Sequence, residues 1–382
     1  LDKLLSLALK QNPTLQARRN QTLAEEDAYK ALRKLPNPSI ALEKGRGESF
    51  DGDISRDIQG LTLSQVIKNP VSWHFRVEAA EKGWQAASEL YRLTELELIC
   101  QIKQKCYSIW LLRNKRNLSE KKTASIKQMS QLIRKRAELG EVKPLDALKL
   151  QVEFLLARNE LKEMETELQI ARDQLNEFLG GLLPSEFTIK GDLKFFPSLL
   201  EENQMVNKAL LAHPLIKEKE SRVAQIENHL AAEKWSRLPD LELSAFSRKE
   251  LHGKISGFGL SLDLPLWNLK SKEISRAENL LQVEKKELEA LRLNLISRVE
   301  AELRRLNLSE ETILVFQEGL LKQAEASLDI AEISYQEGEI SLLEFLDAQR
   351  TFYTILNDYQ DALFRWNANR AALEKTIGEK LE

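Results

Sequence analysis

Two stretches, Val71–Leu139 and Trp267–Glu337, contain no proline and almost no glycine. Their apolar residues recur at steps of three and four, which places them on one narrow stripe of a helix. The stripe residues are Leu98, Ile102, Cys106, Ile109 and Leu112 in the first stretch, and Leu288, Leu291, Leu295, Val299, Leu303 and Leu306 in the second. At the α-helical rise, each stretch is predicted to form one unbroken helix about 100 Å long.

A glycine ends each stretch, and a second helical pattern follows it. The chain reads Gly-Glu-Val-Lys-Pro-Leu-Asp-Ala-Leu from Gly140, and Gly-Glu-Ile-Ser-Leu-Leu-Glu-Phe-Leu from Gly338. Glycine is typical of the left-handed residue that stops a helix. Pro144, and the capping-box pair Ser341 and Glu344, are typical of a helix start. Each glycine is therefore predicted to form the turn of a helical hairpin.

The hairpins belong to an internal repeat with a period of about 200 residues. Four motifs occur twice in the same order: 7–13 and 208–214, 35–38 and 238–240, 60–64 and 259–263, and Gly140 and Gly338. The first repeat is predicted over residues 1–200 and the second over 201–382, and together they form one intertwined structural unit. Each contains a helix, two strands, a long helix and a return helix, and a connector closes the first.

Alternating apolar and polar residues locate the strands, which give the fold a small β part within a mainly α chain. They are predicted at 38–44 and 56–67 (overall about 38–67) and at 240–248 and 254–265 (about 240–265), after helices at 14–34 and 214–237. Loops at 45–52 and 252–253 separate them, and the connector is expected to add a strand at Phe187–Ile189. The polar faces are predicted to hold Glu43, Gln59, Gln65, Glu242, Ser244, Ser261 and Asp263.

Composition excludes several classes of protein. Of 382 residues, 42% are hydrophobic and 30% charged, and the net charge is −3. No run approaches 18 consecutive apolar residues, so no membrane-spanning helix is predicted. The near-neutral charge predicts no nucleic-acid partner. The chain begins at Leu1 rather than Met, so we expect that an N-terminal segment has been removed.

The sequence contains no pattern typical of a catalytic site, so we expect no enzymatic activity, no cofactor and no metal site. Cys100 and Cys106 are six residues apart inside a helical pattern, which suits buried thiols better than a redox or zinc site. The histidines are scattered, at His74, His213, His229 and His252.

The apolar helical stripes must be covered by the other hairpin or by other subunits, and the apolar strand faces also need a cover. An open four-stranded sheet with an apolar outer face is unstable in water. A closed barrel, apolar outside and polar inside, is stable in a membrane. Several copies must share such a barrel, and three copies would supply 12 strands. A soluble coiled-coil scaffold or spacer, capped by a small sheet, remains the alternative.

The ordered motifs resemble those of TolC-like outer-membrane efflux channels over essentially the whole chain. They are Ala-Leu-Lys-Gln-Asn-Pro at 8–13, Leu-Pro-Asn-Pro at 35–38 and Gly-Glu-Ile-Ser-Leu-Leu-Glu-Phe-Leu-Asp at 338–347. The resemblance implies a homotrimer with a shared 12-stranded transmembrane β-barrel in the bacterial outer membrane and a long α-barrel in the periplasm. The stretch Leu-Ser-Gln-Val-Ile-Lys-Asn-Pro at 63–70 is closer to members paired with heavy-metal pumps.

The resemblance further implies a passive exit duct of a tripartite efflux or secretion system. The partners would be a periplasmic adaptor (membrane fusion) protein, an inner-membrane pump of the RND type and outer-membrane lipid. The turns would form the periplasmic tip, which opens on docking the adaptor. Leu139, Gly140, Val142, Gly338 and Ile340 are the predicted docking residues. Val142 and Ile340 alternatively serve only to close the hairpins.

By position, Tyr335 matches a latch tyrosine of the family, and Glu344 and Asp347 match a ring of acids at the aperture. Such a ring favours cations. Glu344 alternatively acts only in the capping box with Ser341. The family's latch can use an arginine just after the glycine, whereas this chain has Ile340, so no salt-bridge latch is expected there.

The residues predicted to face lipid are Leu61, Leu63, Phe258, Leu260, Leu262 and Leu264. In a soluble sandwich the same residues would form the core, so their pattern alone does not separate the two interpretations. The shortage of other strands for a second sheet favours the pore.

Overall fold

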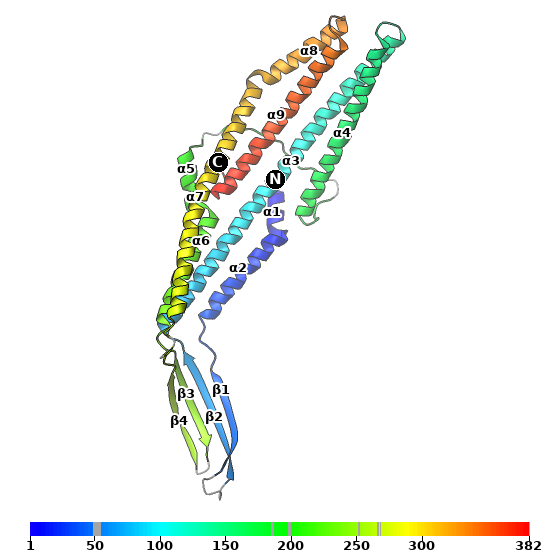
Figure 1. The fold of residues 1–382 in the computed structure, drawn as a ribbon. Coiled ribbons are helices and arrows are strands. Elements are labelled where there is room, and N and C mark those ends of the chain that lie inside the picture. The colour runs from blue at the N-terminus through cyan, green and yellow to red at the C-terminus, as the bar shows by residue number, and fades with distance from the viewer. Residues whose placement is uncertain are drawn as a thin grey trace. The chain divides into compact units, whose positions relative to one another are not determined.

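The computed structural model describes residues 1–48, 55–184, 187–197, 200–250, 253–265, 267 and 269–381. Helices dominate, and the described strands form a four-stranded sheet (Figure 1). The first half contains α1 (Asp2–Gln11), α2 (Pro13–Leu32), β1 (Ser39–Glu48), β2 (Ser55–Ile67), α3 (Pro70–Glu138) and α4 (Pro144–Phe178). The second contains α5 (Glu202–Ala212), α6 (Pro214–Trp235), β3 (Leu241–Lys249), β4 (Lys254–Leu262), α7 (Ser271–Val315), α8 (Leu321–Glu337) and α9 (Leu342–Ile377). This order confirms the predicted fold class.

The two long helices differ from each other. α3 runs without interruption for 69 residues, as predicted. The prediction of one unbroken helix from Trp267 to Glu337 is wrong, because the π-helical segment Phe316–Leu320 separates α7 from α8 and α7 begins only at Ser271. Gly319 has non-helical backbone angles within this segment.

The strands pair antiparallel in the order β1-β2-β3-β4, so the β2–β3 pair joins the two halves. One predicted loop and one predicted strand are wrong. β1 extends to Glu48, which places Gly45 and Gly47 in the strand rather than in a loop. Phe187–Ile189 is not a strand. Residues 49–52 and His252, also predicted as loop, lie outside the described residues.

The register corrects the assignment of two strand faces. Ile40 lies opposite Leu63 and Leu42 opposite Leu61, so these four share one face. Gln59 and Gln65 were predicted on the other face, but they share the face of Leu61 and Leu63 because side chains on a strand alternate with a period of two. The apolar face therefore carries two glutamines.

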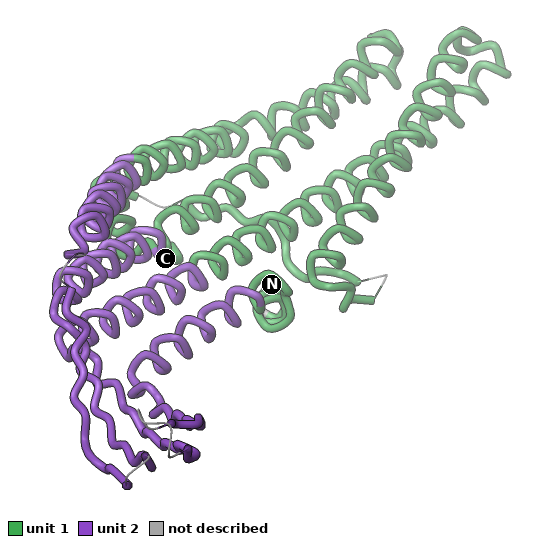
Figure 2. The backbone as a smooth tube through the Cα atoms, turned by 60° about the horizontal axis from the view of Figure 1, so that its bottom comes forward, with its two compact units in different colours: residues 1–16, 93–213, 294–382 green, residues 17–92, 214–293 purple. Residues whose placement is uncertain are grey.

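The chain forms two compact units, which have different colours in Figure 2. One contains residues 17–92 and 214–293, with the sheet and the helical segments joined to it. Within it, the buried Asn69 caps α3 by accepting hydrogen bonds from the backbone N–H of Val71 and Ser72 at 3.0 and 3.3 Å. The Asn69 amide donates to the carbonyl of Trp235 at 2.9 Å, so one side chain ties the start of α3 to the end of α6.

The other unit contains residues 1–16, 93–213 and 294–382. Lys103 pairs with Glu374, and Lys115 lies 2.8 Å from Asp361, so both ion pairs join α3 to α9. Cys100 and Cys106 are free and buried, as predicted. Burial raises the pKa of the Cys106 thiol to about 11.

His213, which follows α5 in this unit, makes stability depend on pH. Its side chain is buried, and burial, with smaller contributions from Arg298 and Lys375, lowers its pKa from 6.5 to about 4. Between pH 6.5 and 4, the imidazole of the unfolded chain is protonated whereas that of the folded chain stays neutral. The contribution of His213 to stability is therefore fully present above pH 6.5 and is lost as the pH falls toward 4. We expect the free energy of unfolding to drop by about 3 kcal/mol over this window.

Denaturant unfolding at pH 7, 5.5 and 4 measures this drop. His213→Gln should flatten the dependence between pH 6.5 and 4, whereas the same substitution at the more exposed His74 should leave it unchanged. An unaltered slope in His213→Gln would contradict the assignment.

Candidate functional site

The first turn, between α3 and α4, is closed by its backbone. Gly140 has a φ of 77°, in the left-handed region that favours glycine. The N–H of Gly140 donates to Ala137 at 3.1 Å, and the N–H of Glu141 donates to Arg136 at 2.9 Å. The Arg136 side chain also lies 3.1 Å from the Glu141 carboxylate. These bonds satisfy carbonyls that the end of α3 would otherwise leave unpaired.

The second turn, between α8 and α9, repeats this geometry and adds a cap. Gly338 has a φ of 81°, and the N–H of Glu339 donates to Ser334 at 2.8 Å. The N–H of Ser341 donates to the Glu344 carboxylate at 2.7 Å, and the N–H of Glu344 donates to the Ser341 hydroxyl at 3.3 Å. The hydrogen bond from the Ser341 backbone lowers the pKa of Glu344. The predicted capping box is therefore confirmed.

Side chains from both turns meet in one hydrophobic cluster, which we call the tip core. Its buried members are Ile133, Leu150, Leu342, Phe345 and Leu346. The half-buried Val142, Tyr335 and Ile340 pack against them. Tyr335 stacks on Phe345 with 5.4 Å between ring centroids and 16° between ring planes. Burial raises the pKa of Tyr335, and the charge of Asp146 raises it further.

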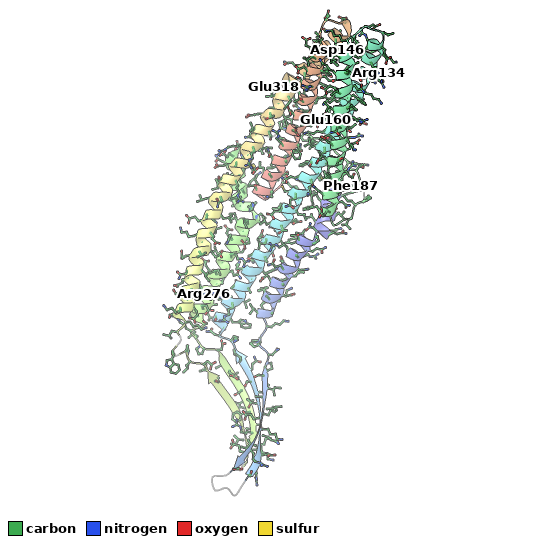
Figure 3. All side chains as sticks on the ribbon, turned by 45° about the vertical axis from the view of Figure 1, so that its right-hand side comes forward. Arg134, Asp146, Glu160, Phe187, Arg276 and Glu318 are labelled. Carbon is green, nitrogen blue, oxygen red and sulfur yellow. The ribbon has the colours of Figure 1, made fainter. Side chains whose placement is uncertain are left out.

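The five predicted docking residues fall into two groups. Leu139 is 75% exposed, and Gly140 and Gly338 are also exposed. A Cβ at either glycine would meet nothing within 4 Å. Val142 and Ile340 instead contact the tip core. Arg134 and Asp146 mark the same end of the unit in Figure 3.

Asp347 is exposed and lines a groove of about 400 Å³ between α4 and α9. The apolar walls are Leu145, Leu148, Val152, Leu156, Leu343 and Leu346. Lys149, Glu153 and Arg350 also line it, and Arg350 lies 3.2 Å from Glu153. Asp347 and Lys149 each stand nine residues after their turn glycine, so equivalent positions in the two halves carry opposite charges.

This groove was not predicted, although the sequence of α4 contains a signal for it. α4 carries a second apolar stripe of exposed residues, Leu145, Leu148, Val152, Leu155 and Leu156. It also carries the buried Leu150 and Ala157. A helix with two apolar stripes needs two partners.

The predicted lipid-facing residues gather on one side of the sheet. The register places Leu61, Leu63, Phe258, Leu260 and Leu262 on one face, and Phe258 is 91% exposed. Leu264 is also exposed, but it lies two residues beyond the end of β4. No helix among the described residues is both long and apolar enough to cross a membrane. Across the same residues, no cluster of three or more His, Cys, Asp or Glu could hold a metal ion.

Comparison with known proteins identifies one family over nearly the whole chain. The family model described as "Outer membrane efflux protein" matches residues 4–181 and 205–379. The cobalt-zinc-cadmium resistance protein CzcC of Cupriavidus metallidurans is 22% identical over 382 residues, covering 99% of this chain and 90% of the relative. The outer membrane protein TolC of Vibrio cholerae is 21% identical over 405 residues, covering 99% of this chain and 90% of the relative.

Solved structures share the fold. A crystal structure of CusC superposes with a TM-score of 0.82 at 19% identity, covering 99% of this chain and 92% of CusC. The open-state MtrE outer membrane channel of Neisseria gonorrhoeae has a TM-score of 0.82 at 17% identity, covering 100% of this chain and 89% of MtrE.

Proposed function

Because the chain belongs to the outer membrane efflux protein family, we propose that it forms the passive outer-membrane and periplasmic exit duct of a tripartite efflux system. Three copies contribute four strands each to one 12-stranded barrel in the outer membrane. Their long hairpins form the periplasmic α-barrel. The duct performs no catalysis, and the inner-membrane pump supplies the energy. In each copy, the repeats 1–200 and 201–382 contribute equivalent parts.

The exposed apolar face of the sheet carries this proposal. Leu42 is 80% exposed, Phe258 91% and Leu260 65%, and all three lie on that face. Each large apolar side chain left in water forgoes about 1.5–3 kcal/mol of burial energy. Contact with lipid supplies that energy, whereas a soluble scaffold would leave the face in water.

The periplasmic adaptor docks at the turns in this proposal. Leu139, Gly140 and Gly338 form the exposed contact surface. Val142 and Ile340 contribute by holding the backbone of the turns against the tip core. The adaptor connects the duct to an inner-membrane pump of the RND type.

The aperture assignment rests on Asp347, Glu344 and Tyr335. Asp347 is exposed and free of the capping contacts that engage Glu344, so three copies of it supply the ring of negative charge. Glu344 serves the ring less directly because its carboxylate binds the N-terminus of α9. Tyr335 holds the tip through its stack on Phe345, in the place of a salt bridge.

A divalent metal cation is the cargo that we propose, since CzcC is named for resistance to cobalt, zinc and cadmium. A ring of carboxylates attracts and binds such ions. A strain lacking this gene should become sensitive to one of these metals before it becomes sensitive to organic dyes. Equal sensitivity to both would contradict a metal-specific system.

Single-channel recording in planar bilayers tests both the duct and the ring. The trimer should give discrete conductance steps, and a divalent cation added on the tip side should reduce them. Asp347→Asn should weaken this block at least tenfold, because three charges leave the constriction together. A trimer that inserts but conducts neither alone nor with the adaptor bound would contradict the proposed function.

Glu344→Gln is the matched control for charge. It removes three charges close to the same constriction and keeps much of the hydrogen-bonding capacity of the cap. We expect a smaller change in cation block than for Asp347→Asn. An equal effect of the two variants would place Glu344 in the ring as well.

A further inference from the structure

A row of basic side chains crosses the sheet on its apolar face, next to the row that contains Leu42 and Leu61. The register pairs Lys44 with Gln59, Gln59 with Lys249, and Lys249 with Lys254. These four positions form one line across all four strands. Directly paired residues share a face, so this basic row lies on the same side as Leu61 and Phe258.

The basic row is exposed and has an excess of positive charge. All four of its side chains are exposed, and its three lysines form no ion pair with a described acid. Lys249 and Lys254 lie directly opposite each other, where like charges destabilise a sheet. Asp57, on the same face one row further out, is paired in the register with Arg46. The Glu43–Arg248 ion pair, at 2.8 Å, lies on the other face.

The position of the basic row fits the edge of a bilayer. Most residues in the rows between it and the helical end of the strands are apolar, from Ile67, Leu241 and Leu262 to Leu42 and Leu61. The polar exceptions are Gln65, Ser247 and Ser256. Gln59 stands eight residues from Ile67, which is roughly 26 Å along the strand. At the 35–45° tilt of barrel strands, this length spans about 20 Å of height, somewhat less than the apolar band of about 25 Å found on outer-membrane barrels.

The far end of the band carries a different marker. Trp267, just beyond β4, is 93% exposed, and indole rings concentrate at the interface between membrane and water. The basic row lies toward the ends of the strands that point away from the helices joined to the sheet (Figure 1). The row therefore marks the boundary opposite the periplasmic helices.

We propose that Lys44, Lys249 and Lys254, with Gln59, bind the phosphate groups of a phosphorylated outer-leaflet lipid, lipopolysaccharide. This inference rests on the proposed function, which places the sheet in the outer membrane. Lysine ammonium groups donate hydrogen bonds to phosphate oxygens and offset their charge. The phosphates in turn relieve the repulsion between Lys249 and Lys254. Three copies of the row encircle the barrel with nine lysines.

Binding of lipopolysaccharide to the detergent-purified trimer tests the proposal, with bound lipid measured by native mass spectrometry. The triple variant Lys44→Gln, Lys249→Gln, Lys254→Gln should bind at least tenfold more weakly than the wild type, and added salt should narrow the difference. The triple arginine variant should bind like the wild type. The control variant Lys127→Gln, Lys162→Gln, Lys322→Gln removes the same charge from exposed helical positions and should also bind like the wild type.

Three results would overturn the proposal. They are unchanged binding by the triple glutamine variant, equal binding of dephosphorylated lipid, and displacement of the lipid by inorganic phosphate at the same concentration. If the triple glutamine variant fails to assemble, Lys249→Gln alone should lower affinity about threefold, and an unchanged affinity would be equally decisive. Channel recording separates the two proposals. A conducting trimer that does not bind lipid phosphate refutes only lipid binding by the basic row. A trimer that conducts neither alone nor with the adaptor bound refutes the duct.

Discussion

Replacing Gly338 with lysine is expected to abolish export while the trimer remains in the outer membrane. A Cβ at this position meets no atom of the same protomer within 4 Å. The backbone at this position is left-handed, with a φ of 81°. A residue other than glycine adopts that conformation at a cost of about 1–2 kcal/mol. A long charged side chain would instead project into the surface where the adaptor is proposed to dock. Gly140→Lys should act in the same way.

Gly180 supplies a matched control. It has a φ of 79°, follows α4 at the end away from the turn, and also has no neighbour within 4 Å of an added Cβ. Gly180→Lys therefore carries the same backbone cost and the same charge without touching the proposed docking surface. Export should be lost in Gly338→Lys and retained in Gly180→Lys, with equal amounts of membrane trimer. Survival of export in both Gly140→Lys and Gly338→Lys would refute docking at the turns.

Truncating Phe345 should produce a large loss of local stability in the tip core. Phe345 is 2% exposed, and it joins the two turns through the tip core and its stack with Tyr335. Phe345→Ala should lower the free energy of local unfolding by about 3–5 kcal/mol, because it removes buried area and leaves a cavity. Hydrogen exchange of the amides in the last turns of α8 and the first turns of α9 measures this loss directly.

The neighbouring Leu343 provides the comparison. It occupies the same first turns of α9 but is 68% exposed, so Leu343→Ala should change the exchange free energy by about 0.5 kcal/mol or less in an isolated protomer. In the assembled trimer, a larger effect would indicate that another copy covers the groove. Equal exchange in Phe345→Ala and the wild type would contradict the role of the tip core.

Much of the tip could be predicted from local sequence. The glycine positions, the Ser341–Glu344 cap and the repeated order of elements each follow from interactions within a few residues, and the structure contains them. The two face errors had a simple cause: Gln59 and Gln65 are two residues from leucines, and strand periodicity places them beside those leucines. The break at Gly319 was missed because one glycine in a long helical pattern is usually tolerated.

The order of helices and strands and the positions of the turns could be predicted from the sequence, because propensity, capping and periodicity act over short distances. Which apolar stripe is buried became clear from the packing of the helices. Leu150 enters the tip core while Leu148 lines an open groove, although both are leucines on α4. The tertiary structure also decided that Lys44, Lys249 and Lys254 form one row, because strand register joins residues about 200 positions apart. Such contacts depend on the pairing of distant segments, which no local pattern encodes.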